Sequence, residues 1–211
     1  MKLKVIEGLI IKAGNKLKVS YKNYKPAKLG RAGQERVFTE RNLTLYLGAE
    51  LIKNQFAVFA EHYFFKNPKI ISPNRGNLGL LDMLALKDNT QIRIEAKRLV
   101  STKAAGSVLK DVPKIKKYFN LNPQLNSTSK KYSSKIGLIL AICNNKTITE
   151  WWSNLAKTSY SKVPGNKKVW DRLKKEIIES KPKLIIGTYN LAPKEKKPPT
   201  ILYAIFKIRQ K

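Results

Sequence analysis

Two apolar segments separated by a polar turn restrict the fold of this chain more than any other feature of its sequence. Residues 79–86 (GLLDMLAL) and 91–98 (QIRIEAKR) both follow a period of two residues, and the residues between them (KDNT) have the composition of a turn. The pattern predicts an antiparallel β-hairpin. Leu84 should then lie opposite Arg93.

Alternation assigns the side chains of this hairpin to two faces. An apolar face would consist of Leu81, Met83, Ala85, Ile92, Ile94 and Ala96. The other face would bring Asp82 opposite Glu95, with Lys97 beside them. Two adjacent carboxylates repel each other and are costly to desolvate unless a cation lies between them. Their oxygens suit Mg²⁺, and the lysine could orient or deprotonate a water molecule. In the alternative interpretation, Asp82 begins a strand and the other two residues are a solvated pair.

The spacing of these residues resembles the motif of the PD-(D/E)xK, or restriction-endonuclease-like, nucleases. The motif here is Leu81-Asp82, twelve residues, and then Glu95-Ala96-Lys97, with leucine in place of the usual proline. The resemblance implies that Asp82, Glu95 and the Ala96 carbonyl bind Mg²⁺, for which Mn²⁺ could substitute. It implies that Lys97 orients and activates the attacking water. It also implies an α/β/α core with a mixed central sheet, in the order helix, three strands, helix, strand.

Members of this family also carry an acidic residue on the helix before the hairpin. Residues 33–54 have the spacing of an amphipathic helix, and Glu40 falls on its apolar stripe. An acid there needs a positive partner, so Glu40 is the first candidate for this carboxylate. Glu35 is the second, although it could simply stabilise the helix N-terminus. Glu61, in the strand-like segment 56–65, is the third.

The segments after the hairpin are predicted to be helical and then extended. Residues 101–110 and 112–120 have helical patterns, and Pro113 either starts a second helix or kinks one. Residues 135–143 form an almost wholly apolar run, as in a strand buried on both faces. Several basic residues would suit phosphate contacts, although a solvated charged face is the commoner explanation. They are Arg93, Arg98, Lys103, Lys110, Lys114 and Lys117.

The expected nuclease core, residues 31–145, has a segment on either side. Residues 1–30 are predicted to be a basic arm containing a β-hairpin, with its turn at Ala13-Gly14-Asn15. Residues 146–211 are predicted to be a C-terminal α+β extension packed on the core. Its helices would lie at 147–159 and 167–180, and its strands at 183–191 and 201–209.

Composition indicates the class of partner. The chain has 43 Lys and Arg against 14 Asp and Glu, a formal net charge of +29, which is far more than solubility requires. A polyanion is therefore the expected partner. No segment has the ~18 apolar residues that span a membrane, and no phosphate-binding glycine motif suggests a nucleotide cofactor. The apolar run at the N-terminus is short, contains Glu7 and lacks a cleavage site, so we expect a cytoplasmic protein.

Together these patterns favour a Mg²⁺-dependent endonuclease acting on double-stranded DNA, most simply a stand-alone type II restriction enzyme. A junction resolvase, a repair nuclease, or a mobile-element or toxin nuclease would carry the same site. A homodimer would suit an enzyme that cuts both strands. The alternative from another class is a non-catalytic, highly basic DNA- or RNA-binding protein.

Overall fold

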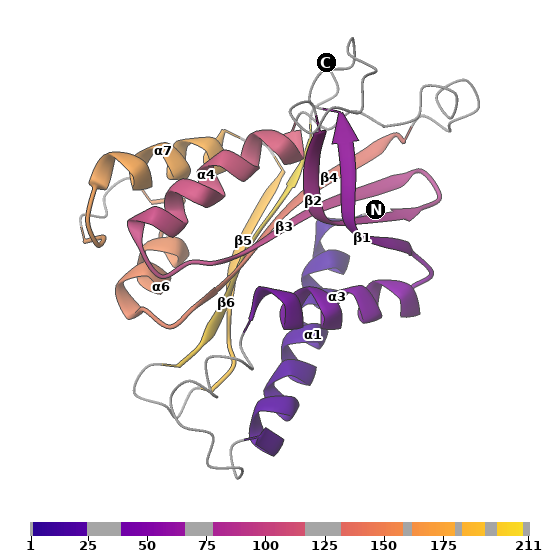
Figure 1. Ribbon diagram of the computed structural model, residues 1–211, viewed down its shortest axis with the longest axis horizontal. Coiled ribbons are helices and arrows are strands. Elements are labelled where there is room, and N and C mark those ends of the chain that lie inside the picture. Colours follow the sequence, from indigo (N-terminus) through magenta and orange to yellow (C-terminus); the bar gives the residue numbers. More distant parts are fainter. Residues whose placement is uncertain are drawn as a thin grey trace.

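The computed structural model describes seven ranges of the chain: 2–24, 39–65, 78–116, 132–157, 162–179, 183–192 and 198–208. Within them the protein is a mixed α/β structure with five helices and one six-stranded sheet (Figure 1). The helices are α1 (Leu3–Tyr24), α3 (Glu40–Lys53), α4 (Thr102–Lys116), α6 (Lys146–Ser153) and α7 (Lys167–Ile178). The strands are β1 (Ala57–Phe65), β2 (Leu78–Lys87), β3 (Thr90–Arg98), β4 (Ser134–Cys143), β5 (Leu184–Asn190) and β6 (Thr200–Lys207).

The central hairpin is confirmed. β2 and β3 are antiparallel with Leu84 opposite Arg93, the register that the alternation predicts. Asp88 begins the turn with a φ of 48°, a conformation that Asp and Asn tolerate better than most residues. The paired residues end at Met83 and Ile94, although β2 remains paired with β1 beyond that point. The two strands of the hairpin therefore separate at Asp82.

The sheet has the strand order β1-β2-β3-β4-β6-β5. β3 and β4 are parallel and every other neighbouring pair is antiparallel. Because parallel neighbours need a crossover connection, α4 lies between β3 and β4 in the chain. The elements from α3 to β4 thus follow the predicted order of helix, three strands, helix, strand. The strands predicted in residues 146–211 are also present, and they extend this sheet through β6, which pairs with β4.

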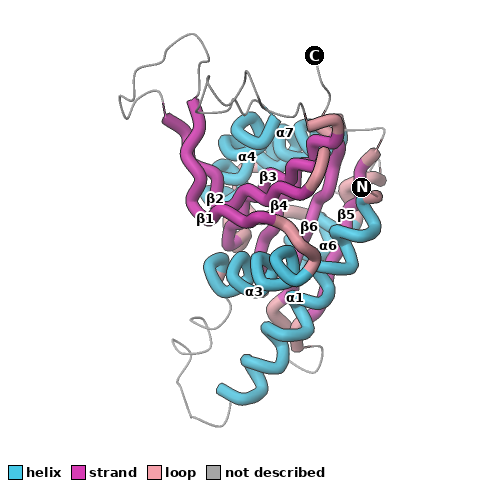
Figure 2. The backbone as a smooth tube through the Cα atoms, turned by 90° about the vertical axis from the view of Figure 1, so that its right-hand side faces the viewer, coloured by secondary structure: helices cyan, strands magenta, loops and turns pink. Residues whose placement is uncertain are grey.

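Helices cover both faces of the sheet. α1 and α3 pack on one face, and α4, α6 and α7 pack on the other (Figures 1 and 2). The first core contains five of the six residues predicted for the apolar face of the hairpin, and Leu81 instead belongs to the second core. The alternation of side chains between the two faces fails at Leu81, because the pairing of β2 with β1 and β3 is interrupted at Asp82. Glu61, between the paired residues Ala60 and His62, has a φ of 50°.

The prediction of a β-hairpin in the basic N-terminal arm is wrong, because Leu3–Tyr24 form the single helix α1. Its buried apolar residues recur three and four positions apart, which is the stripe of an amphipathic helix: Leu3, Ile6, Leu9, Ile10, Ala13 and Leu17. Gly14 was expected in a turn. It lies instead where the helix approaches β5 and β6, and a Cβ there would be 2.7 Å from the Tyr189 ring. Residues 25–38 lie outside the described part of the chain.

The segment after the hairpin is one helix, and α4 continues through Pro113. Residues 117–131, and with them Lys117, lie outside the described residues. Among the described helices, none has the length and apolar character needed to cross a membrane.

Candidate functional site

The separation of β2 from β3 leaves part of the β3 backbone unpaired on the β2 side. The gap that opens between β2 and β3 beyond Met83 and Ile94 is called the fork below. The Asp82 carboxylate occupies the fork, and its Oδ2 accepts a 2.7 Å hydrogen bond from the Ala96 N–H. The Glu40 carboxylate, from the other side of the fork, accepts the N–H of Arg98. The N–H and C=O of a strand residue point to the same side, so the Ala96 carbonyl also faces the fork. Two acidic side chains therefore replace the missing strand pairing.

Glu95 is the most deeply buried acid of this group, with 2 % of its surface exposed. Its Oε1 makes no hydrogen bond within the described structure, and Lys114 Nζ lies 4.0 Å from it. Burial, together with the negative charges of Asp82 and Asp111, raises the pKa of Glu95 to about 9. Without an added cation, this carboxyl group is thus protonated at neutral pH.

Lys97 lies between two carboxylates. Its Nζ is 3.8 Å from Oδ2 of Asp82 and 3.5 Å from Oδ2 of Asp111. Burial acts to lower the pKa of Lys97, but the surrounding negative charges outweigh it and raise that pKa above its ordinary value. Lys97 is therefore a cation here, suited to binding a phosphate oxygen or holding a water molecule. Its raised pKa does not suit it to deprotonating one.

Glu40 reaches the site from a different position than its sequence pattern suggested. α3 begins at Glu40 with Thr39 as its N-cap, so Glu40 lies in the first helical turn and not on a mid-helix apolar stripe. Its carboxylate is favourably placed at the positive end of the helix dipole. Its charge is also among those that raise the pKa of Lys97. The rival candidate Glu35 lies outside the described residues.

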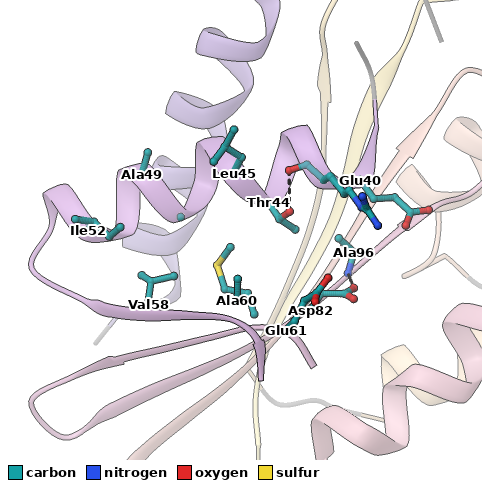
Figure 3. A pocket seen from close by; sticks show the side chains of 13 residues that line it. Glu40, Thr44, Leu45, Ala49, Ile52, Val58, Ala60, Glu61, Asp82 and Ala96 are labelled. Carbon is teal, nitrogen blue, oxygen red and sulfur yellow. Dashed lines mark hydrogen bonds between the residues drawn. The ribbon is translucent and has the colours of Figure 1, made fainter. Parts of the chain in front are cut away.

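An open groove of about 810 Å³ between α3 and β1 leads to this site (Figure 3). Glu40 and Asp82 lie at one end of it, and Ile52 and Val58 lie at the other. Glu61, the third candidate acid, is exposed on β1 and lines the same groove. The carboxylates of Glu40 and Asp82 are thus accessible to a ligand from this side.

Asp111 of α4 belongs to the cluster and was not identified from the sequence. It is 5 % exposed, and its Oδ1 lies 2.5 Å from Lys114 Nζ. The sequence does indicate this position, because Asp111 is three residues after Val108 and four before Ile115, on the buried stripe of the helix. An acid on an apolar helical stripe needs a positive partner, and the two lysines are that partner.

The expectation that Arg93 contacts phosphate is wrong. Its side chain is buried, with 3 % of the residue exposed. The guanidinium donates through Nε to Gln91 and through Nη1 to the backbone carbonyl of Ile115 near the end of α4. Arg93 thus joins β3 to α4, inside the second core.

The other predicted phosphate contacts occupy different positions. Lys103 and Lys110 are exposed on α4, and Arg98 is half-buried at the end of β3. Lys114 is partly exposed within the carboxylate cluster. Lys117 is outside the described residues. Only Lys103 and Lys110 of this set lie on an open surface of the described structure.

The comparisons with known proteins identify no relative: no family model matches the chain, and no curated protein or solved structure matches it. Among the described residues, no group of three or more His, Cys, Asp and Glu side chains is arranged to hold a metal ion. A smaller donor set is present at the fork, formed by the carboxylates of Asp82 and Glu95 and the carbonyl of Ala96. All are hard oxygen donors of the kind that Mg²⁺ accepts, with water and substrate oxygens completing its shell. The buried Glu95 oxygen without a hydrogen bond fits such an ion.

Proposed function

We propose that this protein is a Mg²⁺-dependent endonuclease of the PD-(D/E)xK type that hydrolyses phosphodiester bonds in double-stranded DNA. The observation that carries the proposal is the meeting of Asp82, Glu95 and Lys97 at the fork, where a buried Glu95 oxygen makes no hydrogen bond within the described structure. The order of elements from α3 to β4 supports a restriction-endonuclease-like core.

Each residue of the site has a role in this proposal. Asp82, Glu95 and the Ala96 carbonyl would hold the metal, with Mn²⁺ able to replace Mg²⁺, and a bound ion would neutralise the carboxylates and lower the pKa of a water molecule. The Lys97 ammonium would hold a phosphate oxygen and stabilise the charge that builds on it. Glu40 would complete the acidic set through a water molecule.

Charge supports DNA as the substrate. The formal charge of +29 favours a polyanion, and Lys103 and Lys110 present cations on the exposed side of α4. Within the nuclease class we favour a cytoplasmic restriction-type enzyme that cuts both strands as a homodimer. A resolvase, repair, mobile-element or toxin nuclease would use the same site chemistry.

Cleavage of supercoiled plasmid tests the proposal. Wild-type protein should nick and linearise plasmid with Mg²⁺, and EDTA should abolish the reaction. Asp82→Ala and Lys97→Ala should each lower the rate at least ~100-fold, because each removes a group that acts on the reacting phosphate. Asp171→Ala, at an exposed position of α7, is the matched control and should cleave like wild type.

Each other outcome of the plasmid assay has its own interpretation. Undiminished cleavage by the Asp82 and Lys97 variants would remove the site assignment. Binding without cleavage in Mg²⁺ or Mn²⁺ would favour the non-catalytic nucleic-acid-binding alternative. Discrete fragments would select a restriction enzyme, and preferential cutting of a four-way junction would select a resolvase.

A further inference from the structure

Five side chains around the fork form a series of alternating charge. Lys97 lies between Asp82 and Asp111, and Lys114 lies between Asp111 and Glu95. The four Nζ to oxygen distances are 3.8, 3.5, 2.5 and 4.0 Å in that order along the series. Asp111 is the member that touches both lysines, and it comes from a different element than the two carboxylates of the fork.

We infer that Asp111 is a positioning residue that holds the ammonium groups of Lys97 and Lys114 against the carboxylate pair, and that Lys114 is a second phosphate-binding cation. This inference rests on the proposed nuclease function, which it deepens by defining how the site binds the phosphodiester. Asp111 would act through the two lysines and not on the substrate itself.

Burial supports this role for Asp111. Its side chain is 8 % exposed, whereas those of Lys97 and Lys114 are 27 % and 36 % exposed. Lysine side chains are long and flexible, and a single weak ion pair near the surface holds them poorly. The buried carboxylate gives each lysine a second anchor. Its Oδ2 makes no hydrogen bond within the described structure, so the nearby ammonium of Lys97 is its main compensation.

Charge balance supports an additional carboxylate at the site. With every group ionised, the three carboxylates and two ammonium groups of the series carry one net negative charge, and the carboxylate of Glu40 at the fork adds a second. One divalent cation would neutralise these two charges. Without the charge of Asp111, the metal-bound site would carry an additional positive charge, and neither lysine would have its inner anchor.

The alternative is a purely structural role, in which Asp111 only joins α4 to β3. A double-mutant cycle separates the two roles. Asp111→Asn should lower kcat for plasmid cleavage about 10-fold to 100-fold with little change in KM, and Lys114→Ala should act similarly. The double variant should be little worse than either single variant. Asp111→Glu, which keeps the charge, should recover much of the rate, and Asp171→Asn is the control.

A second measurement does not depend on activity. Ammonium groups that are held by carboxylates exchange slowly enough for ¹H–¹⁵N NMR, so Lys97 and Lys114 should give signals in wild-type protein. Both signals should be lost in Asp111→Asn while its backbone spectrum stays native. If either variant unfolds, Asp111→Glu provides the folded comparison.

The outcomes separate this inference from the proposed function. Wild-type protein that shows the ammonium signals but never cleaves DNA would overturn the nuclease proposal, and with it the phosphate-binding role of Lys114. Retention of both signals in Asp111→Asn would overturn the positioning role. Additive losses of kcat in the double variant would show that Asp111 does not act through Lys114.

Discussion

At the scale of single residues, Glu95 shows best why the fork is a candidate site. A glutamine or a leucine at this position would avoid the cost of a buried carboxyl group beside two other acids. The chain has only 14 acidic residues, and four of them, Glu40, Asp82, Glu95 and Asp111, gather here. Glu95, whose pKa is raised, lies beside Asp82, which lines the groove, and a perturbed group next to a cleft is typical of functional sites.

Glu95→Gln should change how stability depends on pH. The folded pKa of about 9 lies above the ordinary value of 4.5, so folded protein keeps a proton that unfolded protein has lost. The stabilisation from this group is full below pH 4.5 and declines as pH rises toward 9. The loss between pH 4.5 and pH 7 is at most about 3 kcal/mol. Urea unfolding in EDTA at several pH values should show a flatter profile for Glu95→Gln.

Two comparisons make this measurement decisive. Mg²⁺ at pH 8 should stabilise wild-type protein and have little effect on Glu95→Gln, because in the proposed metal site the ion would replace the proton on this carboxyl group. Glu179→Gln, at an exposed position after α7, should keep the wild-type profile. Parallel profiles for wild type and Glu95→Gln would contradict the burial of a shifted carboxyl group.

At the scale of elements, the apolar pattern of the sequence predicted most of the helices and strands. It gave the register of the β2–β3 hairpin, the buried strand β4, and the helices and strands of the last third of the chain. It failed for α1, because Gly14 and Asn15 resemble a turn while the contact of Gly14 with Tyr189 is 175 positions away in sequence. The fork could not be predicted from the sequence either, because it depends on the residue at which β2 separates from β3.

Two glycines of α1 should respond oppositely to alanine. At Gly8 a Cβ would meet nothing within 4 Å, so Gly8→Ala should stabilise the helix by about 0.5–1 kcal/mol. At Gly14 the Cβ would lie 2.7 Å from Tyr189 Cδ1 and 3.0 Å from Ile201 Cδ1. Gly14→Ala should therefore destabilise the protein by about 1–3 kcal/mol. The free energy of unfolding in urea measures both, and equal effects would contradict a helix docked on β5 and β6.

At the scale of the whole molecule, composition predicted an excess of positive charge and hence a polyanionic partner, but no site of contact. Charge can be counted in a sequence, whereas its distribution depends on the fold. Arg93 is the example, since its guanidinium is buried against α4. Helices α4 and α1 cover opposite faces of the sheet (Figure 2), and each carries exposed lysines.

Salt should act in opposite directions on folding and on DNA binding. Raising the salt concentration from about 50 to about 500 mM screens the repulsion among the excess positive charges, so the free energy of unfolding should increase. The same salt opposes counterion release and should weaken DNA binding. In a plot of the logarithm of the binding constant against the logarithm of the salt concentration, each phosphate contact contributes about 0.9 to the slope.

Replacing both Lys103 and Lys110 by glutamine should therefore lower that slope by about 2. Replacing Lys12 and Lys22 of α1 removes the same charge from the other face and should leave the slope nearly unchanged. Binding of a DNA duplex in Ca²⁺, followed by fluorescence anisotropy over this salt range, measures the slope for each of the two double variants. Equal reductions by the two pairs would show that α4 is not the face that contacts DNA, and that only the overall charge of the protein attracts it.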